Sequence, residues 1–69
     1  MFPIGAVIED MKGTYKILEA QQLGAEEKYR VQILAQKIPI FQHIPITDPT
    51  KIKWLIISSQ NLSTIKRIS

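Results

Sequence analysis

The fold is decided by the stretch Trp54-Leu-Ile-Ile-Ser-Ser-Gln-Asn-Leu-Ser-Thr-Ile-Lys-Arg-Ile-Ser69. It begins with four apolar residues, which predict a strand, and continues with a polar run that is typical of a tight turn. A short basic strand follows the turn. Two strands joined this closely predict a small closed β-barrel and place basic residues beside its last strand.

Two earlier segments alternate between apolar and polar residues with the period of a β-strand. The weaker pattern is residues 14–20, and Gly24 after it can adopt the positive φ angle of a turn. The clearer pattern, residues 28–35, places on one face Tyr29, Val31, Ile33 and Ala35. We therefore expect the two segments to form a hairpin.

A helix is the alternative for residues 16–37. This segment is rich in Glu, Ala, Gln, Leu and Lys, which all favour helices. Gly24 lies in its middle and costs about 1 kcal/mol relative to Ala in a helix. The composition leaves both the hairpin and a partly helical segment open.

The next two segments differ in how they are expected to pair. Residues 38–46 contain Pro39 and Pro45, which cannot donate hydrogen bonds to a neighbouring strand. This excludes a helix and argues against a central strand, so we expect an edge strand or extended arm whose isoleucines lie on the core. Residues 53–58 are apolar on both faces and are expected to form a central strand.

The C-terminal stretch 54–69 resembles the end of an SH3-like barrel, in which a strand runs into one 3-10 turn and a short closing strand. The resemblance implies that residues 59–62 form the turn and that the buried side carries Leu62, Ile65 and Ile68. With the apolar segment 4–8 and the hairpin, it implies an all-β, five-stranded SH3-like barrel, a single domain over residues 1–69. The Pro and Tyr of peptide-binding SH3 domains are replaced here by Ser59 and Leu62, and the fold itself carries no function.

The residue inventory argues against catalysis. The chain has no Cys and one His, His43, so a disulfide is excluded and a Cys/His zinc site is not expected. No Gly-rich phosphate loop is present. The acidic pairs 9–10 and 26–27 are adjacent in sequence, so their side chains diverge on a strand or lie in turns. We expect a non-enzymatic protein without metal or cofactor.

The length of 69 residues allows one small domain. Its core must be built from apolar packing, and a homo-oligomer would reinforce it. No secretory signal is visible, and no apolar run approaches the roughly 20 residues that span a bilayer. We therefore expect a cytoplasmic protein without membrane contact.

Positive charge is concentrated in the second part of the chain. Residues 1–27 carry a net charge of −3 and residues 28–69 a net charge of +6, an asymmetry that indicates an anionic partner. Small barrels bind single strands through basic groups and aromatic rings. We therefore expect a site for nucleic acid or another polyanion formed by Lys28, Arg30, Lys53, Lys66 and Arg67, with Phe41 as a stacking group.

Two alternatives stay open. The charges could be solvated strand faces that mix in the folded chain, and we expect Tyr29 and Trp54 to pack inside the barrel. The proline-containing arm and the apolar strand 53–58 could also present an edge to a protein partner or to a second copy of the chain. Salt separates these functions, because phosphate binding weakens steeply with ionic strength and apolar contacts do not.

Overall fold

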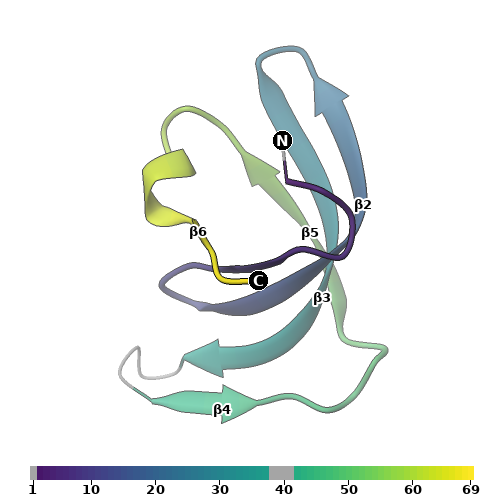
Figure 1. Cartoon of the computed structure of the whole chain (residues 1–69), viewed down its shortest axis with the longest axis vertical. Helices are drawn as coiled ribbons and strands as arrows, with labels where there is room; N and C mark the ends of the chain where they lie inside the picture. Colours follow the sequence, from purple (N-terminus) through teal and green to yellow (C-terminus); the bar gives the residue numbers. More distant parts are fainter. Residues whose placement is uncertain (1, 38–41) are drawn as a thin grey trace.

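The computed structural model describes residues 2–37 and 42–69 and is organised around one long antiparallel hairpin (Figure 1). Strand β2 (Gly13–Leu23) runs through a tight turn into strand β3 (Glu26–Lys37). Gly24 in the turn has a φ of 59°, a left-handed conformation that glycine adopts without steric cost. The expected hairpin is therefore confirmed and is longer at both ends, and the helical alternative for this segment is wrong.

The remaining strands add to this hairpin to make one antiparallel sheet in the order β4-β3-β2-β1-β6, with β5 also paired to β3. β3 therefore has β2 along one edge, while its other edge is shared by β5 and β4. The added elements are the strands β1 (Val7–Glu9), β4 (His43–Pro45), β5 (Ile52–Ile57) and β6 (Lys66–Arg67) and a 3-10 helix, η1 (Leu62–Thr64). The expected all-β class is confirmed, and with the short β4 the described residues form six strands where five were expected.

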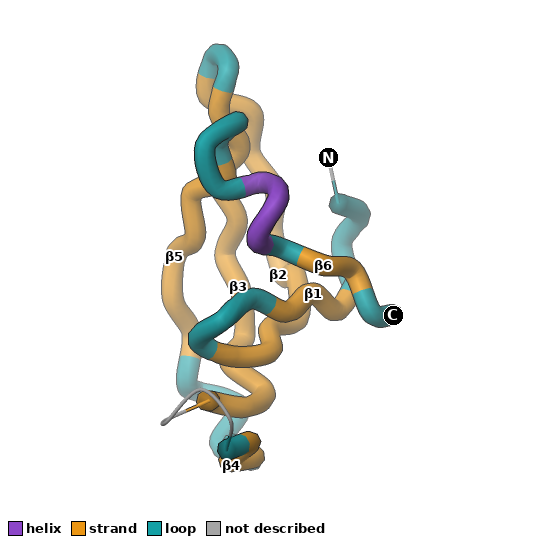
Figure 2. Tube along the Cα trace, turned by 90° about the vertical axis from the view of Figure 1, so that its left-hand side faces the viewer, coloured by secondary structure: helices purple, strands orange, loops and turns teal. Residues whose placement is uncertain are grey.

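The sheet is curled, so that one of its faces encloses the core. The pairing of β2 with β3 shifts register between Thr14 and Tyr15 and between Ile17 and Glu19, and such bulges bend a strand and increase its twist. Figure 2 shows the curl from the side, with β6 lying along β1. The enclosed core consists of Ala6, Ile8, Tyr15, Ile17, Tyr29, Val31 and Ile57.

Two expectations about β5 are wrong. β5 pairs only with β3 among the described residues and is an edge strand, although it is apolar on both faces. Trp54 was expected inside the barrel, but it lies opposite Arg30 in the pairing with β3 and is exposed. Residues directly opposite one another in an antiparallel pair lie on the same face of the sheet. Because Arg30 points away from the core, Trp54 does so as well.

The final turn also differs from the expected one. Its 3-10 helix is Leu62–Thr64, a little later than expected, because the side chain of Asn61 organises the preceding residues. Asn61 Oδ1 accepts a hydrogen bond from the Ser58 N–H at 2.7 Å, and Asn61 Nδ2 donates to the Ile56 carbonyl at 3.0 Å. Leu62 and Ile68 are exposed instead of buried, and only Ile65 packs partly against the core.

The proline-containing segment is an edge strand where the structure describes it. Pro45 lies in β4, which pairs with the end of β3, as expected for a strand that contains proline. The side chain of Ile44 is exposed, so the expectation that the isoleucines lie on the core is wrong at this position. Ile38, Ile40 and Phe41 lie outside the described residues.

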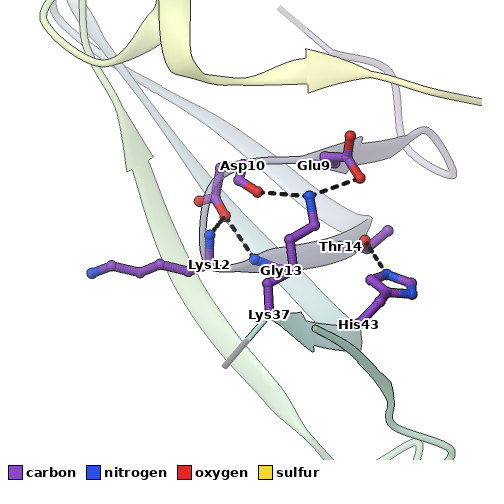
Figure 3. Close-up of polar contacts among 7 residues, drawn as sticks. All are labelled: Glu9, Asp10, Lys12, Gly13, Thr14, Lys37 and His43. Atoms are coloured by element: carbon purple, nitrogen blue, oxygen red, sulfur yellow. Dashed lines mark hydrogen bonds and ion pairs between the residues drawn. The ribbon is translucent and has the colours of Figure 1, made fainter. Parts of the chain in front are cut away.

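The turn between β1 and β2 depends on Asp10 and Gly13. Asp10 Oδ1 accepts hydrogen bonds from the backbone N–H groups of Lys12 at 2.8 Å and Gly13 at 3.0 Å (Figure 3). A Cβ atom on Gly13 would overlap the carbonyl oxygen of Ala35 on β3, so no larger residue fits here without moving the backbone.

We predict that Gly13→Ala lowers the free energy of unfolding by about 1–3 kcal/mol, the usual cost of overpacking a well-packed site. Urea unfolding followed by circular dichroism measures it. Ser59→Ala is the control, because this turn residue is exposed and its replacement is expected to change stability by less than about 0.5 kcal/mol. Equal stability of Gly13→Ala and the parent chain would contradict the close approach.

Tyr29 anchors the segment that precedes β1. Its hydroxyl accepts a hydrogen bond from the Phe2 N–H at 2.9 Å and donates one to Glu27 Oε1 at 2.7 Å. Burial, together with the hydrogen bond to Glu27, raises the pKa of Tyr29 to about 12. Burial, together with the nearby charge of Asp10, likewise raises the pKa of Tyr15 to about 12.

These pKa shifts predict a loss of stability at alkaline pH. Below pH 10 both phenols are neutral in the folded and the unfolded chain. From the unfolded value of 10.0 up to about 12, the unfolded chain releases these protons first, so the free energy of unfolding falls as the pH rises. Urea unfolding at several pH values between 9 and 12 measures the fall.

The variants Tyr15→Phe and Tyr29→Phe are the controls, because lysines titrate over the same range. Each variant is expected to show a shallower fall with pH than the parent chain. An unchanged slope in both variants would mean that the tyrosines do not cause it.

Candidate nucleic-acid interface

Lys28 and Arg30 lie on the side of the sheet that faces away from the core. They alternate along β3 with Tyr29 and Val31, which are fully buried. Arg30 is paired with Trp54 of β5, and Lys28 with the next outward residue of that strand. The expected neighbourhood of these two cations is therefore present in the folded chain.

Trp54 is the centre of this surface. Its side chain is 49% exposed, and the flanking outward residues Ile52 and Ile56 are 42% and 48% exposed. The ammonium of Lys28 lies over the Trp54 ring, 4.5 Å from its centre, in a cation–π contact that a base stacking on that face of the ring would displace. We call the five residues of this surface the outer face: Lys28, Arg30, Ile52, Trp54 and Ile56.

The charge of Arg30 is only weakly compensated. Glu19 on β2 approaches it at 3.4 Å, but both side chains are substantially exposed, at 41% and 55%. Exposed pairs of this kind contribute about 0–1 kcal/mol and are screened by salt. The Arg30 Nε atom is buried and has no hydrogen-bond partner in the described part of the chain. An incoming anion can therefore replace Glu19 at small cost.

Lys53 lies on the opposite face from Lys28 and Arg30. It is paired with the buried Val31 and therefore points toward the core side of the sheet. Its ammonium lies 4.5 Å from the centre of the Tyr15 ring and donates a hydrogen bond to the Tyr15 hydroxyl at 3.3 Å. Lys53 is thus separated from the outer face by the thickness of the sheet.

Lys66 and Arg67 form a third location. Both are exposed on β6, which pairs with Glu9 and Ile8 of β1. The Arg67 Nε–H points toward the Ser69 carbonyl at 3.4 Å. Phe41, the expected stacking group, lies outside the described residues. The expected residue set is therefore divided, and the structure brings together only its members Lys28 and Arg30.

Sequence reasoning missed Trp54 as an exposed ring. The relevant sequence feature is that β5 is apolar on both faces, a pattern that predicts a central strand. The same pattern is compatible with an edge strand that has one apolar face exposed, and the sequence of β5 holds no feature that separates the two. The pairing of Trp54 with Arg30 decides it.

A different kind of surface lies at the free end of the hairpin. A cavity of about 410 Å³ opens there, with Phe2, Ile57 and Leu62 among its apolar lining residues. Glu27 is the one charged residue among the described residues that line it. This cavity suits an apolar group and not a phosphate.

The described residues contain no cluster of three or more His, Cys, Asp or Glu side chains that could hold a metal ion. Over the same part of the chain, no helix has both the length and the apolar character needed to cross a bilayer. Comparison of the chain with protein-family models, with curated proteins and with solved structures finds no match.

Proposed function

We propose that this chain is an SH3-like barrel that acts as a non-enzymatic module and binds single-stranded nucleic acid on its outer face. The fold part of the proposal is supported by the strand order β5-β3-β2-β1-β6, with a 3-10 helix before the last strand. In that order the final strand returns to pair with the first, as the end of an SH3-like barrel does.

The exposed ring of Trp54 beside two cations is the observation that carries the functional part. Bases stack on exposed aromatic rings with about 1–3 kcal/mol each, and any base can do so because every base has a π-face. Lys28 and Arg30 lie on the neighbouring strand, where a phosphate next to the stacked base passes. The ligand is a single strand, since bases in a duplex are stacked on one another and not free to stack on Trp54.

Fluorescence titration with mixed-sequence oligonucleotides of roughly ten nucleotides, within the site sizes known for small barrels, tests this proposal. Trp54 is the only tryptophan of the chain, so its quenching reports binding at the outer face. Anisotropy of a labelled oligonucleotide follows variants that lack the ring. Trp54→Ala is expected to weaken binding by about tenfold or more, and Trp54→Phe by less because a smaller ring still stacks.

The matched control for charge is Lys66→Glu, which makes the same change as Lys28→Glu on a different strand. Lys28→Glu is expected to weaken binding strongly and Lys66→Glu much less. A larger effect of Lys66→Glu, or binding without any change in Trp54 fluorescence, would contradict the outer face as the interface.

The salt dependence predicts how many phosphates the outer face neutralises. Two cations on a single strand give a slope of about −1.4 in a plot of log affinity against log salt concentration, and Lys28→Gln is expected to reduce it to about −0.7. The titrations are repeated at several sodium chloride concentrations. A slope near zero in the parent chain would exclude phosphate contacts.

Strand addition to β5 is the second candidate function. The edge of β5 that faces away from β3 carries no paired strand among the described residues, and Ile52, Trp54 and Ile56 form an exposed apolar stripe along it. A protein partner or a second copy could extend the sheet there. This function predicts association that neither added salt nor Lys28→Gln weakens, measured by sedimentation of the chain over a range of concentrations.

A further inference from the structure

A second surface with a different character lies on the core side of the sheet, near the turn between β1 and β2. It is a cavity of about 330 Å³ between β2, the end of β3 and β5. Three lysines line it, together with one tyrosine, one glutamine and one isoleucine: Lys12, Lys37, Lys53, Tyr15, Gln36 and Ile33. A cavity of this size is at the lower end of the range of small-molecule sites.

Lys53, one of these three lysines, is held in position by Tyr15. The Tyr15 ring lies beneath its ammonium and the Tyr15 hydroxyl accepts one of its protons. An ammonium group has three donors, so two N–H groups of Lys53 stay available for a ligand. Tyr15 is buried, and its phenol is neutral at physiological pH even at the ordinary pKa of 10.0, so it adds no negative charge to the cavity.

The other two lysines differ in their compensation. Lys37 contacts Glu9 Oε2 at 3.0 Å and donates a hydrogen bond to the Asp10 carbonyl at 3.2 Å (Figure 3). The Lys12 side chain extends away from the Asp10 carboxylate, and within the described residues no acceptor contacts its ammonium (Figure 3). The uncompensated charges of the cavity are therefore those of Lys12 and Lys53.

The acidic groups nearby leave a positive balance. Glu9 is engaged with Lys37, and one carboxylate oxygen of Asp10 accepts two backbone N–H groups. Three lysines thus face two carboxylates, and both carboxylates have partners of their own. Ammonium groups that line one cavity and have no carboxylate partner there attract an anion.

We propose that this cavity binds a phosphoryl group. Lysine ammonium groups bind phosphate as point charges, and Lys12 and Lys53 approach the cavity from two different elements, the β1–β2 turn and β5. Gln36 adds an amide donor, while Ile33 and Tyr15 leave room for an apolar part of the ligand. The site is independent of the outer face, because Lys53 and Lys28 lie on opposite sides of the sheet.

The test is a titration of the full chain with sodium phosphate, followed by amide NMR shifts. Sodium chloride at equal ionic strength is the reference for general salt effects. Phosphate is expected to shift the amide signals around the cavity more than chloride does, and the shifts should saturate as the phosphate concentration rises. The signals concerned are those of Lys12, Gly13, Gln36 and Lys37. Equal shifts with both salts would overturn the proposal.

Three variants are expected to change the phosphate affinity in opposite directions, which a general salt effect does not do. Lys12→Gln and Lys53→Gln are each expected to weaken phosphate binding by about threefold to fivefold, the size of a partly exposed charge pair. Glu9→Gln is expected to strengthen it by about threefold, because it frees Lys37. The controls Lys16→Gln and Glu26→Gln make the same charge changes at exposed positions away from the cavity and are expected to leave the affinity unchanged.

The Lys12→Gln variant is expected to fold like the parent chain, because the Lys12 side chain is exposed and has no role in the core. Its affinity therefore reports on the site and not on misfolding. Unchanged affinity in Lys12→Gln and Lys53→Gln, or weaker binding in Glu9→Gln, would overturn the site. Trp54→Ala is expected to leave phosphate binding intact, so failure of this proposal is distinguishable from failure of the outer face.

Three probes distinguish the possible sources of the phosphoryl group: a mononucleotide, a 5′-phosphorylated oligonucleotide and the same oligonucleotide with a 5′-hydroxyl. A mononucleotide that binds more tightly than inorganic phosphate identifies a small phosphate ester. A 5′-phosphorylated oligonucleotide that binds more tightly than the same oligonucleotide with a 5′-hydroxyl identifies a chain end. If neither ester binds the parent chain more tightly than it binds Lys12→Gln, the proposal fails.

Discussion

The structure depends on β3, which among the described residues is paired on both edges over nearly its whole length. It pairs with β2 along one edge, and its other edge pairs with β5 and β4. Its alternation sends Tyr29 and Val31 into the core and Lys28 and Arg30 outward. The outer face and the lysine-lined cavity take their positions from this register, because a slip of one residue would exchange the two faces.

Local sequence signals predicted the elements that are determined locally. The hairpin followed from the period-two pattern of residues 28–35 and from Gly24, whose backbone conformation is a property of the turn itself. Pro45 predicted an edge strand because the missing N–H acts at its own position. The burial of Tyr29 followed from the same alternation. In each case the physical cause lies within a few residues of the signal.

The features that were not predicted depend on pairing between distant segments. β5 is apolar on both faces, so its sequence does not say which face meets the core, and only its register with β3 turns Trp54 outward. Leu62 is exposed at the start of η1, directly after Asn61, whose side chain bonds back to the backbone of Ser58 and Ile56. The five expected cations all lie in the basic part of the chain, between residues 28 and 69. The strand register nevertheless places Lys53 on the opposite face from Lys28 and Arg30, and Lys66 and Arg67 lie on β6.

The position of the Lys28 ammonium over Trp54 has a consequence for the behaviour of the chain at high concentration. A strand edge without a paired neighbour and with exposed apolar side chains is the kind of template on which like chains stack into fibrils, and β5 is such an edge among the described residues. The positive charge of Lys28, on the adjacent strand β3, makes two copies repel one another when they approach edge to edge. Acetylation of Lys28 would remove this charge, and the loss of repulsion would favour self-assembly of the chain.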